Sequence, residues 1–156
     1  MRDIVPFLWF ADGNAEEAVR YYVSVFPNSR VRSIRHYPDE RLSEHFRGMQ
    51  GKVLTAEFEL NGRRFMALDG EAIFRLSEAF SLLIECDSQE EIDYYWDRLS
   101  HVPESEACGW CKDRFGVSWQ IVPRGMDAYM DSDAAVAAVM DMKKIDVKAL
   151  DDAAGR

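Results

Sequence analysis

The sequence has no long apolar run: no stretch approaches the ~20 consecutive apolar residues that a membrane-spanning helix requires. Its first residues, Met1-Arg2-Asp3, lead directly into a strand-like segment and lack the pattern of a signal peptide. Basic residues are outnumbered, with 19 Lys and Arg against 28 Asp and Glu and a formal net charge of -9. Binding to a polyanion requires clustered Lys and Arg, so we expect neither a nucleic acid nor an anionic membrane as a partner. We expect a cytoplasmic protein.

Cysteine is also scarce, and the three residues Cys86, Cys108 and Cys111 are an odd number, which is not typical of a disulfide framework. Cys108-Gly109-Trp110-Cys111 has the spacing of a redox or zinc pair. On an extended segment, however, the two Cα atoms would lie about 10 Å apart, beyond the ~7 Å limit for a disulfide. Zinc would need two further ligands, and the sequence has no second CxxC. We interpret these cysteines as structural.

A duplicated pattern organises the remaining sequence. Glu16-Glu17 recurs as Glu90-Glu91, and Tyr21-Tyr22 recurs as Tyr95-Trp96, at a constant offset of 74 positions. In both places a strand-like segment, a capping residue, an acidic first turn and an aromatic pair follow one another, which indicates an internal repeat. The predicted strands cover residues 4–10, 31–37, 53–60, 63–68, 80–86, 108–112 and 117–122, and the predicted helices cover residues 15–26 and 89–99.

These elements predict an α+β fold of paired βαβββ modules, with one helix on one face of each mixed sheet. We place the first module at residues 1–72, the second at residues 73–124 and a helical tail at residues 125–156, all within one structural domain. The faces opposite the helices would then curl around a cleft. Strand alternation and the repeat register predict which side chains face that cleft. The residues that we single out are Phe7, Trp9, Thr55, Glu57, Ala67, Ser81, Ser118 and Gln120; the same alternation also turns Glu59, Phe65, Leu83 and Glu85 to the cleft.

Three of these positions have side chains suited to recognition or chemistry. The Gln120 amide can both donate to and accept from a bound ligand, although it could equally be a satisfied polar group on a half-exposed strand. Glu57 could act as a general base if it is buried, whereas such a residue is more often solvated or paired with an arginine. Trp9, together with Phe7, could stack on a planar ligand, or it could form packing or dimer contacts.

Several sequence runs closely resemble a known family. They are Phe7-Leu8-Trp9-Phe10, Asn14-Ala15-Glu16-Glu17-Ala18, the run from Val53 to Gly62, and the run from Cys108 to Pro123 with its Lys112-Asp113-Arg114-Phe115-Gly116 turn. These runs are similar to the PhnB-like family, often labelled "3-demethylubiquinone-9 3-methyltransferase", of the glyoxalase / vicinal oxygen chelate superfamily. The resemblance extends through Met142-Lys143-Lys144-Ile145-Asp146, and it implies paired βαβββ modules and a homodimer.

The same resemblance bears on the chemistry. Metal enzymes of the superfamily carry His and Glu on inward positions of the first and fourth strands of each module, which correspond here to Phe7, Ala67, Ser81 and Gln120. Phe and Ala cannot ligate a divalent ion, so we expect no metal and no cofactor in the cleft. Thr55 stands near the place where some family members carry a His.

Methyl transfer is also unexpected, despite the family label. The usual S-adenosylmethionine fold needs a glycine-rich turn after its first parallel strand, whereas the turn at residues 11–14 has one glycine. Two functions remain: a protein that binds a small molecule in a metal-free cleft, or a glyoxalase-like lyase or isomerase that uses acid/base groups such as Glu57 or recruits a divalent metal. The sequence leaves open whether the protein is an enzyme.

Overall fold

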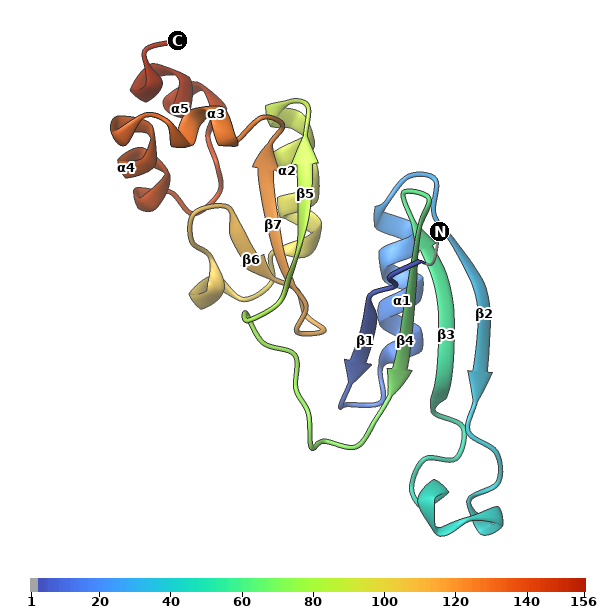
Figure 1. Cartoon of the computed structure of the whole chain (residues 1–156). Coiled ribbons are helices and arrows are strands. Elements are labelled where there is room, and N and C mark those ends of the chain that lie inside the picture. Colours follow the sequence, from blue (N-terminus) through green and yellow to red (C-terminus); the bar gives the residue numbers. More distant parts are fainter. Residues whose placement is uncertain (1–2) are drawn as a thin grey trace. The chain divides into compact units, whose positions relative to one another are not determined.

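The computed structural model describes residues 3–156, which form two compact units, with the boundary between Leu76 and Ser77 (Figure 1). Each unit contains one mixed β-sheet and helices, so the predicted α+β class is confirmed. In the part of the chain that the structure describes, no helix is long and apolar enough to cross a membrane.

The first unit is a four-stranded sheet with one long helix. Its strand order is β1-β4-β3-β2; β1 runs parallel to β4, and the other neighbours are antiparallel. Asn61 and Gly62, with φ of 48° and 76°, form the tight turn that the Asn-Gly pair predicts between the last two strands. The elements are β1 (Phe7–Phe10), α1 (Ala15–Val25), β2 (Arg30–His36), β3 (Val53–Leu60) and β4 (Arg63–Asp69), with the short 3-10 helices η1 (Glu40–Leu42) and η2 (Glu44–Phe46) between β2 and β3.

Helix α1 covers one face of this sheet because its apolar side chains recur at helical spacing. Ala18, Val19 and Tyr22 have no exposed surface. The sheet contributes Phe58 and Phe65, whose rings stack with centroids 5.6 Å apart. This layer is the core of the first unit, and it leaves the opposite face of the sheet open.

The second unit repeats the order of the first with one strand fewer. Its sheet has the order β5-β7-β6, with β5 parallel to β7, so its module is βαββ and not the expected βαβββ. Only ten residues separate α2 from β6, against 27 between α1 and β3, and this is too few for a strand equivalent to β2 and its return. The elements are β5 (Ser81–Cys86), α2 (Gln89–Leu99), the 3-10 helix η3 (Pro103–Ser105), β6 (Trp110–Lys112), β7 (Ser118–Pro123), α3 (Asp127–Met130), α4 (Asp133–Asp141) and α5 (Val147–Ala154).

The C-terminal segment is fastened to the second unit by backbone and side-chain bonds. The amide of Cys108 donates to the carbonyl of Met142 at 2.8 Å. Gln89, at the start of α2, donates to the carbonyl of Ile145 at 3.1 Å and accepts from the amide of Val147 at 2.8 Å. Ile145 is fully buried, so the segment after α4 is part of this unit's core.

Candidate functional site

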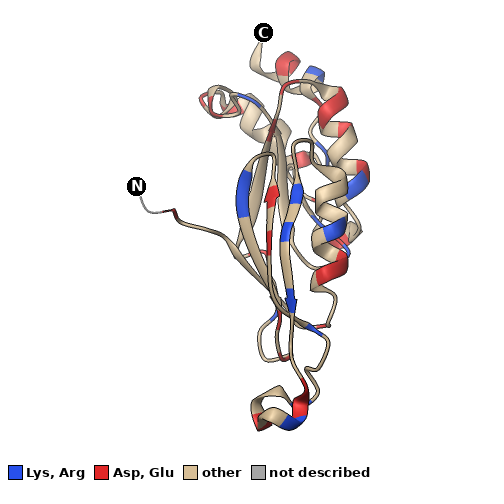
Figure 2. Cartoon of the chain, turned by 90° about the vertical axis from the view of Figure 1, so that its right-hand side faces the viewer, with Lys and Arg blue, Asp and Glu red and all other residues tan. Residues whose placement is uncertain are grey.

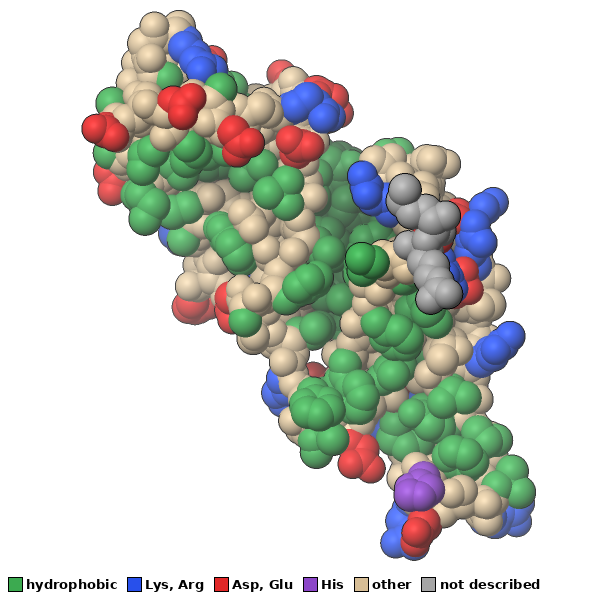
Figure 3. Space-filling view, viewed as in Figure 1, with side chains coloured by type: hydrophobic (Ala, Val, Ile, Leu, Met, Phe, Trp, Pro, Cys, Tyr) green, Lys and Arg blue, Asp and Glu red, His purple; other side chains and the backbone are tan. Residues whose placement is uncertain are grey.

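The open face of the first sheet carries the predicted aromatic pair. Leu8 and Phe10 are buried under α1, and the alternation of β1 therefore turns Phe7 and Trp9 to the other side, as predicted. Phe7 is 49% exposed. Figure 3 shows hydrophobic side chains gathered over the region of β1 and β4.

Trp9 is held by the segment that follows β4. Its indole Nε1 donates to the carbonyl of Glu71 at 3.0 Å, and its ring meets Phe74 edge to face at 5.1 Å between centroids. Gly70 lies so close that an added Cβ atom would be 2.0 Å from the indole Cε2. The orientation of the indole is therefore fixed, and its contact with a ligand remains a prediction.

The predicted facing of Ala67 is wrong, and so is that of Phe65, which stacks on Phe58 in the core. Ala67 pairs with Ala56 of β3 and with Leu8 of β1, and all three side chains are buried on the face covered by α1. Residues directly opposite each other in a ladder point to the same side of a sheet, so Ala67 belongs to the core and does not line the open face. An alanine fits either face, and its pairing, which decides the matter, is not visible in the sequence.

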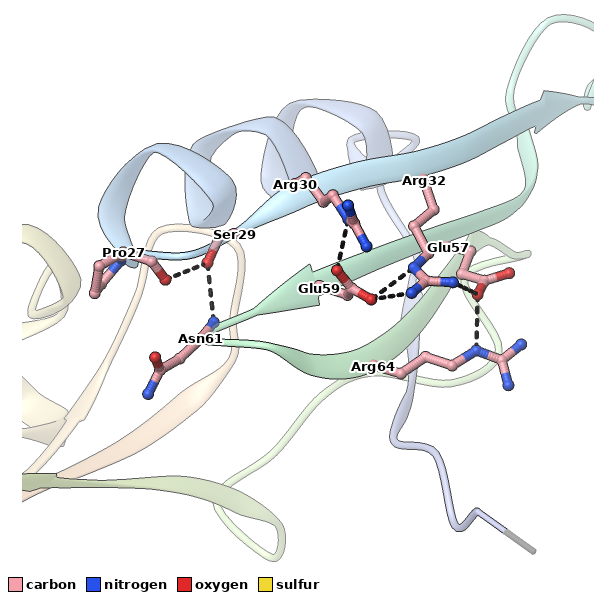
Figure 4. Close-up of polar contacts among 8 residues, drawn as sticks. All are labelled: Pro27, Ser29, Arg30, Arg32, Glu57, Glu59, Asn61 and Arg64. Atoms are coloured by element: carbon pink, nitrogen blue, oxygen red, sulfur yellow. Dashed lines mark hydrogen bonds and ion pairs between the residues drawn. The ribbon is translucent and has the colours of Figure 1, made fainter.

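Glu57 points to the open face, where it belongs to a ladder of charges (Figure 4). Its Oε1 accepts from Arg64 Nε of β4 at 2.8 Å and lies 3.8 Å from Arg32 of β2. Glu59, two residues along, accepts from Arg30 at 2.7 Å and also from Arg32, and these arginine bonds hold the pKa of Glu59 below its usual value. Figure 2 shows the basic segments of β2 and β4 on either side of the acidic segment of β3.

This charge ladder was not found from the sequence. Arg30 and Arg32 stand on either side of Val31, and Arg64 precedes Phe65, so strand alternation was the available signal. Without the register between strands, however, no arginine could be assigned to a particular glutamate. Thr55 also lies on this face, half-buried and opposite Arg35 of β2.

The open side of the second sheet brings the other three predicted residues together. Ser81 stands opposite Ser118 in the parallel pair of β5 and β7, and Gln120 Nε2 donates to Ser81 Oγ at 2.8 Å. Ser118 is 2% exposed, and its hydroxyl has no hydrogen-bond partner among residues 3–156. Leu83, opposite Gln120, is 54% exposed and adds an apolar border.

Two buried carboxylates lie outside the predicted site residues. Asp69 accepts from the amide of Ala15 at 2.9 Å and from that of Val53 at 2.8 Å, and so it joins the start of α1 to the start of β3. Asp113 accepts from two amides of its own turn and from Trp119 Nε1 at 2.8 Å. Both carboxylates serve the fold, and Asp113 acts as the turn-stabilising residue that its charged turn predicts.

Cys86 and Cys111 are buried thiols. Burial raises the pKa of Cys86 and of Cys111 to about 12, so both thiols stay protonated at neutral pH and are poor nucleophiles. Within residues 3–156, no group of three or more His, Cys, Asp or Glu side chains is placed to hold a metal ion.

Comparison with known proteins gives the family. The model of the family "3-demethylubiquinone-9 3-methyltransferase" matches residues 2–122. The PhnB protein from Bacillus cereus is 34% identical, with a TM-score of 0.63 over 78% of this chain and 99% of that chain. This chain belongs to the PhnB-like family. The helices α3–α5 and the expected resemblance at residues 142–146 lie outside the matched range.

More distant structures share the fold of this PhnB-like protein. Protein PA1353 from Pseudomonas aeruginosa is 20% identical, with a TM-score of 0.58 over 79% of this chain and 98% of that chain. The fosfomycin resistance protein FosX from Listeria monocytogenes is 14% identical, with a TM-score of 0.51 over 81% of this chain and 94% of that chain. These likenesses confirm the glyoxalase / vicinal oxygen chelate fold. No curated protein matches the chain.

Proposed function

We propose that this PhnB-like protein binds a small organic molecule on the open faces of its sheets, without a resident metal ion, and that it does so as a homodimer in the cytoplasm. The observation that carries the proposal is the unpaired hydroxyl of Ser118. A buried polar group without a partner costs about 1–3 kcal/mol, so a ligand that reaches this hydroxyl through a small movement of the side chains over it gains that free energy. Ser118 is 2% exposed, and no described residue bonds its Oγ.

The surroundings of Ser118 suit a small ligand with polar groups. Ser81 and Gln120 already form one hydrogen bond, and the amide oxygen of Gln120 and the Ser118 hydroxyl can make further bonds. Leu83 provides an exposed apolar contact beside them. Ligand sites typically combine a few polar groups with such apolar surface. On the first unit, Phe7, Trp9 and Thr55 are proposed as ligand contacts of that unit's own open face.

The homodimer and the compartment are supported by surface and composition. Phe7, Phe80 and Leu83 are each about half exposed or more, and large exposed apolar side chains favour an interface. Three unpaired cysteines are typical of a reducing compartment. Sedimentation velocity at micromolar concentration tests the dimer directly.

Methyl transfer is not part of the proposal. Both sheets mix parallel and antiparallel neighbours, whereas the usual S-adenosylmethionine fold is a doubly wound, mostly parallel sheet. The turn after β1 has the single glycine Gly13, so it offers no glycine-rich cradle for a cofactor.

A glyoxalase-like lyase or isomerase is the second candidate. The partly buried carboxylate of Glu57 favours it, since this side chain is 25% exposed on the open face and could take a proton from a bound substrate. Elemental analysis of the purified protein separates the candidates: stoichiometric Ni, Zn or Mn would favour the metal-recruiting enzyme and contradict metal-free binding.

A thermal-shift screen of a fragment library, followed by calorimetry, tests the binding function. Ser118→Ala and Gln120→Ala are expected to weaken a confirmed hit about tenfold, because each removes a hydrogen bond to it. Ser118→Ala should leave the melting point of the empty protein unchanged or higher, since the lost hydroxyl has no internal partner. The control Ser24→Ala, on the exposed side of α1, should change neither. Unchanged affinity in both site variants would contradict the proposal.

A further inference from the structure

The open face of the second sheet carries an aromatic side chain beside its polar trio of Ser81, Ser118 and Gln120. Trp110 of β6 stands directly opposite Gln120 of β7, and residues opposite each other in a ladder point to the same side of a sheet. Leu83 of β5 stands opposite Gln120 on the other edge of β7. The side chain of Gln120 is therefore flanked by a half-buried indole and an exposed leucine.

The polar trio still has both a donor and an acceptor to offer. Gln120 uses an Nε2 hydrogen on Ser81, which leaves its amide oxygen as an acceptor. Ser118 stands opposite Ser81, and its hydroxyl, which has no partner among residues 3–156, can donate a hydrogen bond. A ligand that matches both groups carries a donor next to an acceptor.

The charged side chains of this face are already in ion pairs. Lys112 stands opposite Ser118 on β6, and its Nζ contacts Glu78. Glu85, two residues beyond Leu83 on β5, lies 3.8 Å from Arg124. A charged ligand group would have to displace one of these partners or stay unpaired, and a charge that loses water without gaining a partner is unfavourable. An uncharged ligand breaks no pair.

We infer that the ligand of this face is an uncharged, planar amide or lactam. Its N–H donates to the amide oxygen of Gln120, its carbonyl accepts from Ser118, and its flat part lies against Trp110, since aromatic side chains stack on planar groups. Ser118 is 2% exposed, so the side chains over it shift slightly when the carbonyl binds. This inference rests on the proposed function, because it names the class of ligand for the same site and adds Trp110 to its contacts.

Calorimetric titration with matched probes tests the class of ligand. Benzamide, benzoate and benzamidinium share one ring and a head group of one shape, but they carry no charge, a negative charge and a positive charge. We expect benzamide to bind at least about tenfold more tightly than either ion. N,N-Dimethylbenzamide, which lacks the N–H donor, should bind as weakly as the ions. No heat from benzamide at millimolar concentration, or tighter binding of an ion, would overturn the inference.

Gln120→Glu should reverse this preference. Glutamate has the shape of glutamine but adds a negative charge, so the variant should bind benzamidinium more tightly than benzamide. Gln50→Glu is the matched control, because it adds the same charge at an exposed glutamine of the first unit. It should leave the preference for benzamide unchanged. An equal reversal in Gln50→Glu would show a general charge effect and overturn the inference.

Two outcomes distinguish this inference from the proposed function. A charged hit from the fragment library that is weakened by Ser118→Ala and Gln120→Ala would overturn the amide class and leave the proposed site intact. Benzamide binding that neither substitution weakens would contradict the proposed site itself. Trp110→Leu keeps an apolar side chain and should weaken benzamide severalfold, because it removes the ring contact. Unchanged affinity in this variant would overturn the stacking on Trp110.

Discussion

The two units begin alike and differ most in their charge. Each starts with a strand, a cap and a helix whose first turn carries two glutamates. The first unit has eleven basic and eleven acidic residues, whereas the second has eight basic and seventeen acidic, so the whole net charge of -9 falls in the second. Apolar positions of the repeat are constrained by packing, but surface charges are free to diverge. The two units have therefore kept a common apolar pattern while their surface charges have diverged.

The buried carboxylates show a second contrast. Asp69 joins Ala15 and Val53, segments that lie 54 and 16 residues from it in sequence. The bonds that Asp113 accepts from Phe115, Val117 and Trp119 come from two to six residues away. The first unit thus uses its carboxylate to fasten a helix to a sheet, while the second uses it to shape one turn. The second unit gains its long-range connections from the C-terminal segment around Ile145 instead.

The largest effect is expected from Asp69→Ala. The variant leaves two buried amides without an acceptor, and we expect the free energy of unfolding to fall by about 3–5 kcal/mol. Urea denaturation followed by circular dichroism measures it. Asp12→Ala is the control, because its exposed pair with Arg75 contributes about 0–1 kcal/mol. A loss below about 1 kcal/mol for Asp69→Ala would contradict the role of this carboxylate in joining α1 to β3.

Ile145→Ala tests whether the C-terminal segment stabilises the second unit. Truncation of a fully buried isoleucine typically costs about 2–5 kcal/mol, and Met140→Ala, at a side chain that is 67% exposed, should cost under about 0.5 kcal/mol. Hydrogen exchange gives the local readout: the amides of Cys108 and Gly109, which bond Met142 and Lys143, should lose protection. If they stay protected, the C-terminal segment does not complete this core.

Gly70→Ala probes the packing of Trp9 against the segment that follows β4. The new Cβ would lie 2.0 Å from the indole, so the side chain or the backbone must shift, at a cost of about 1–3 kcal/mol. In a Trp9→Ala background the same substitution should cost much less. A double-mutant cycle by urea denaturation measures the coupling, and additive effects would show that the indole is not the obstacle.

Sequence reasoning predicted the elements well where patterning was strong. The bounds of β3 and α2 are as predicted, and the facing of Phe7 and Trp9 followed from the repeat register. The predicted direction of the Ala67 side chain was wrong, because a small apolar side chain is compatible with both faces of a sheet. Only its pairing with Ala56 shows which face it occupies. The second module has one strand fewer than the label βαβββ implies, although the strands predicted from its residues, 80–86, 108–112 and 117–122, correspond to the three that the structure has.

The candidate site was predictable only in part. Ser81 and Gln120 are brought together because their strands are neighbours in the repeat, which the sequence could indicate. The unpaired state of Ser118 could not be foreseen, since it depends on every atom around one hydroxyl. The charge ladder around Glu57 depends on strand register, a long-range property that single-chain periodicity does not contain.

The smallest effect concerns pH. Hydrogen bonds from Arg30 and then Arg32 lower the pKa of Glu59 from its usual 4.5, whereas the Ser100 hydroxyl is the main cause of the lowered pKa of Glu106 in the second unit. A lowered folded-state pKa contributes stability above the unfolded value, and this contribution is lost as pH falls below about 4.5. Glu59→Gln and Glu106→Gln should therefore both flatten the fall in melting point between neutral pH and pH ~3.

Salt should separate these two glutamates. In 0.5 M NaCl the Debye length falls to about 4 Å, so exposed charge pairs are screened while a bond from a neutral hydroxyl is not. The difference between wild type and Glu59→Gln on the acid limb should shrink with salt, and the difference for Glu106→Gln should persist in larger part, since Lys143 is the lesser of its two partners. Equal shrinkage would mean that charge dominates at both glutamates, and the contrast between the arginine-bonded Glu59 and the hydroxyl-bonded Glu106 would not hold.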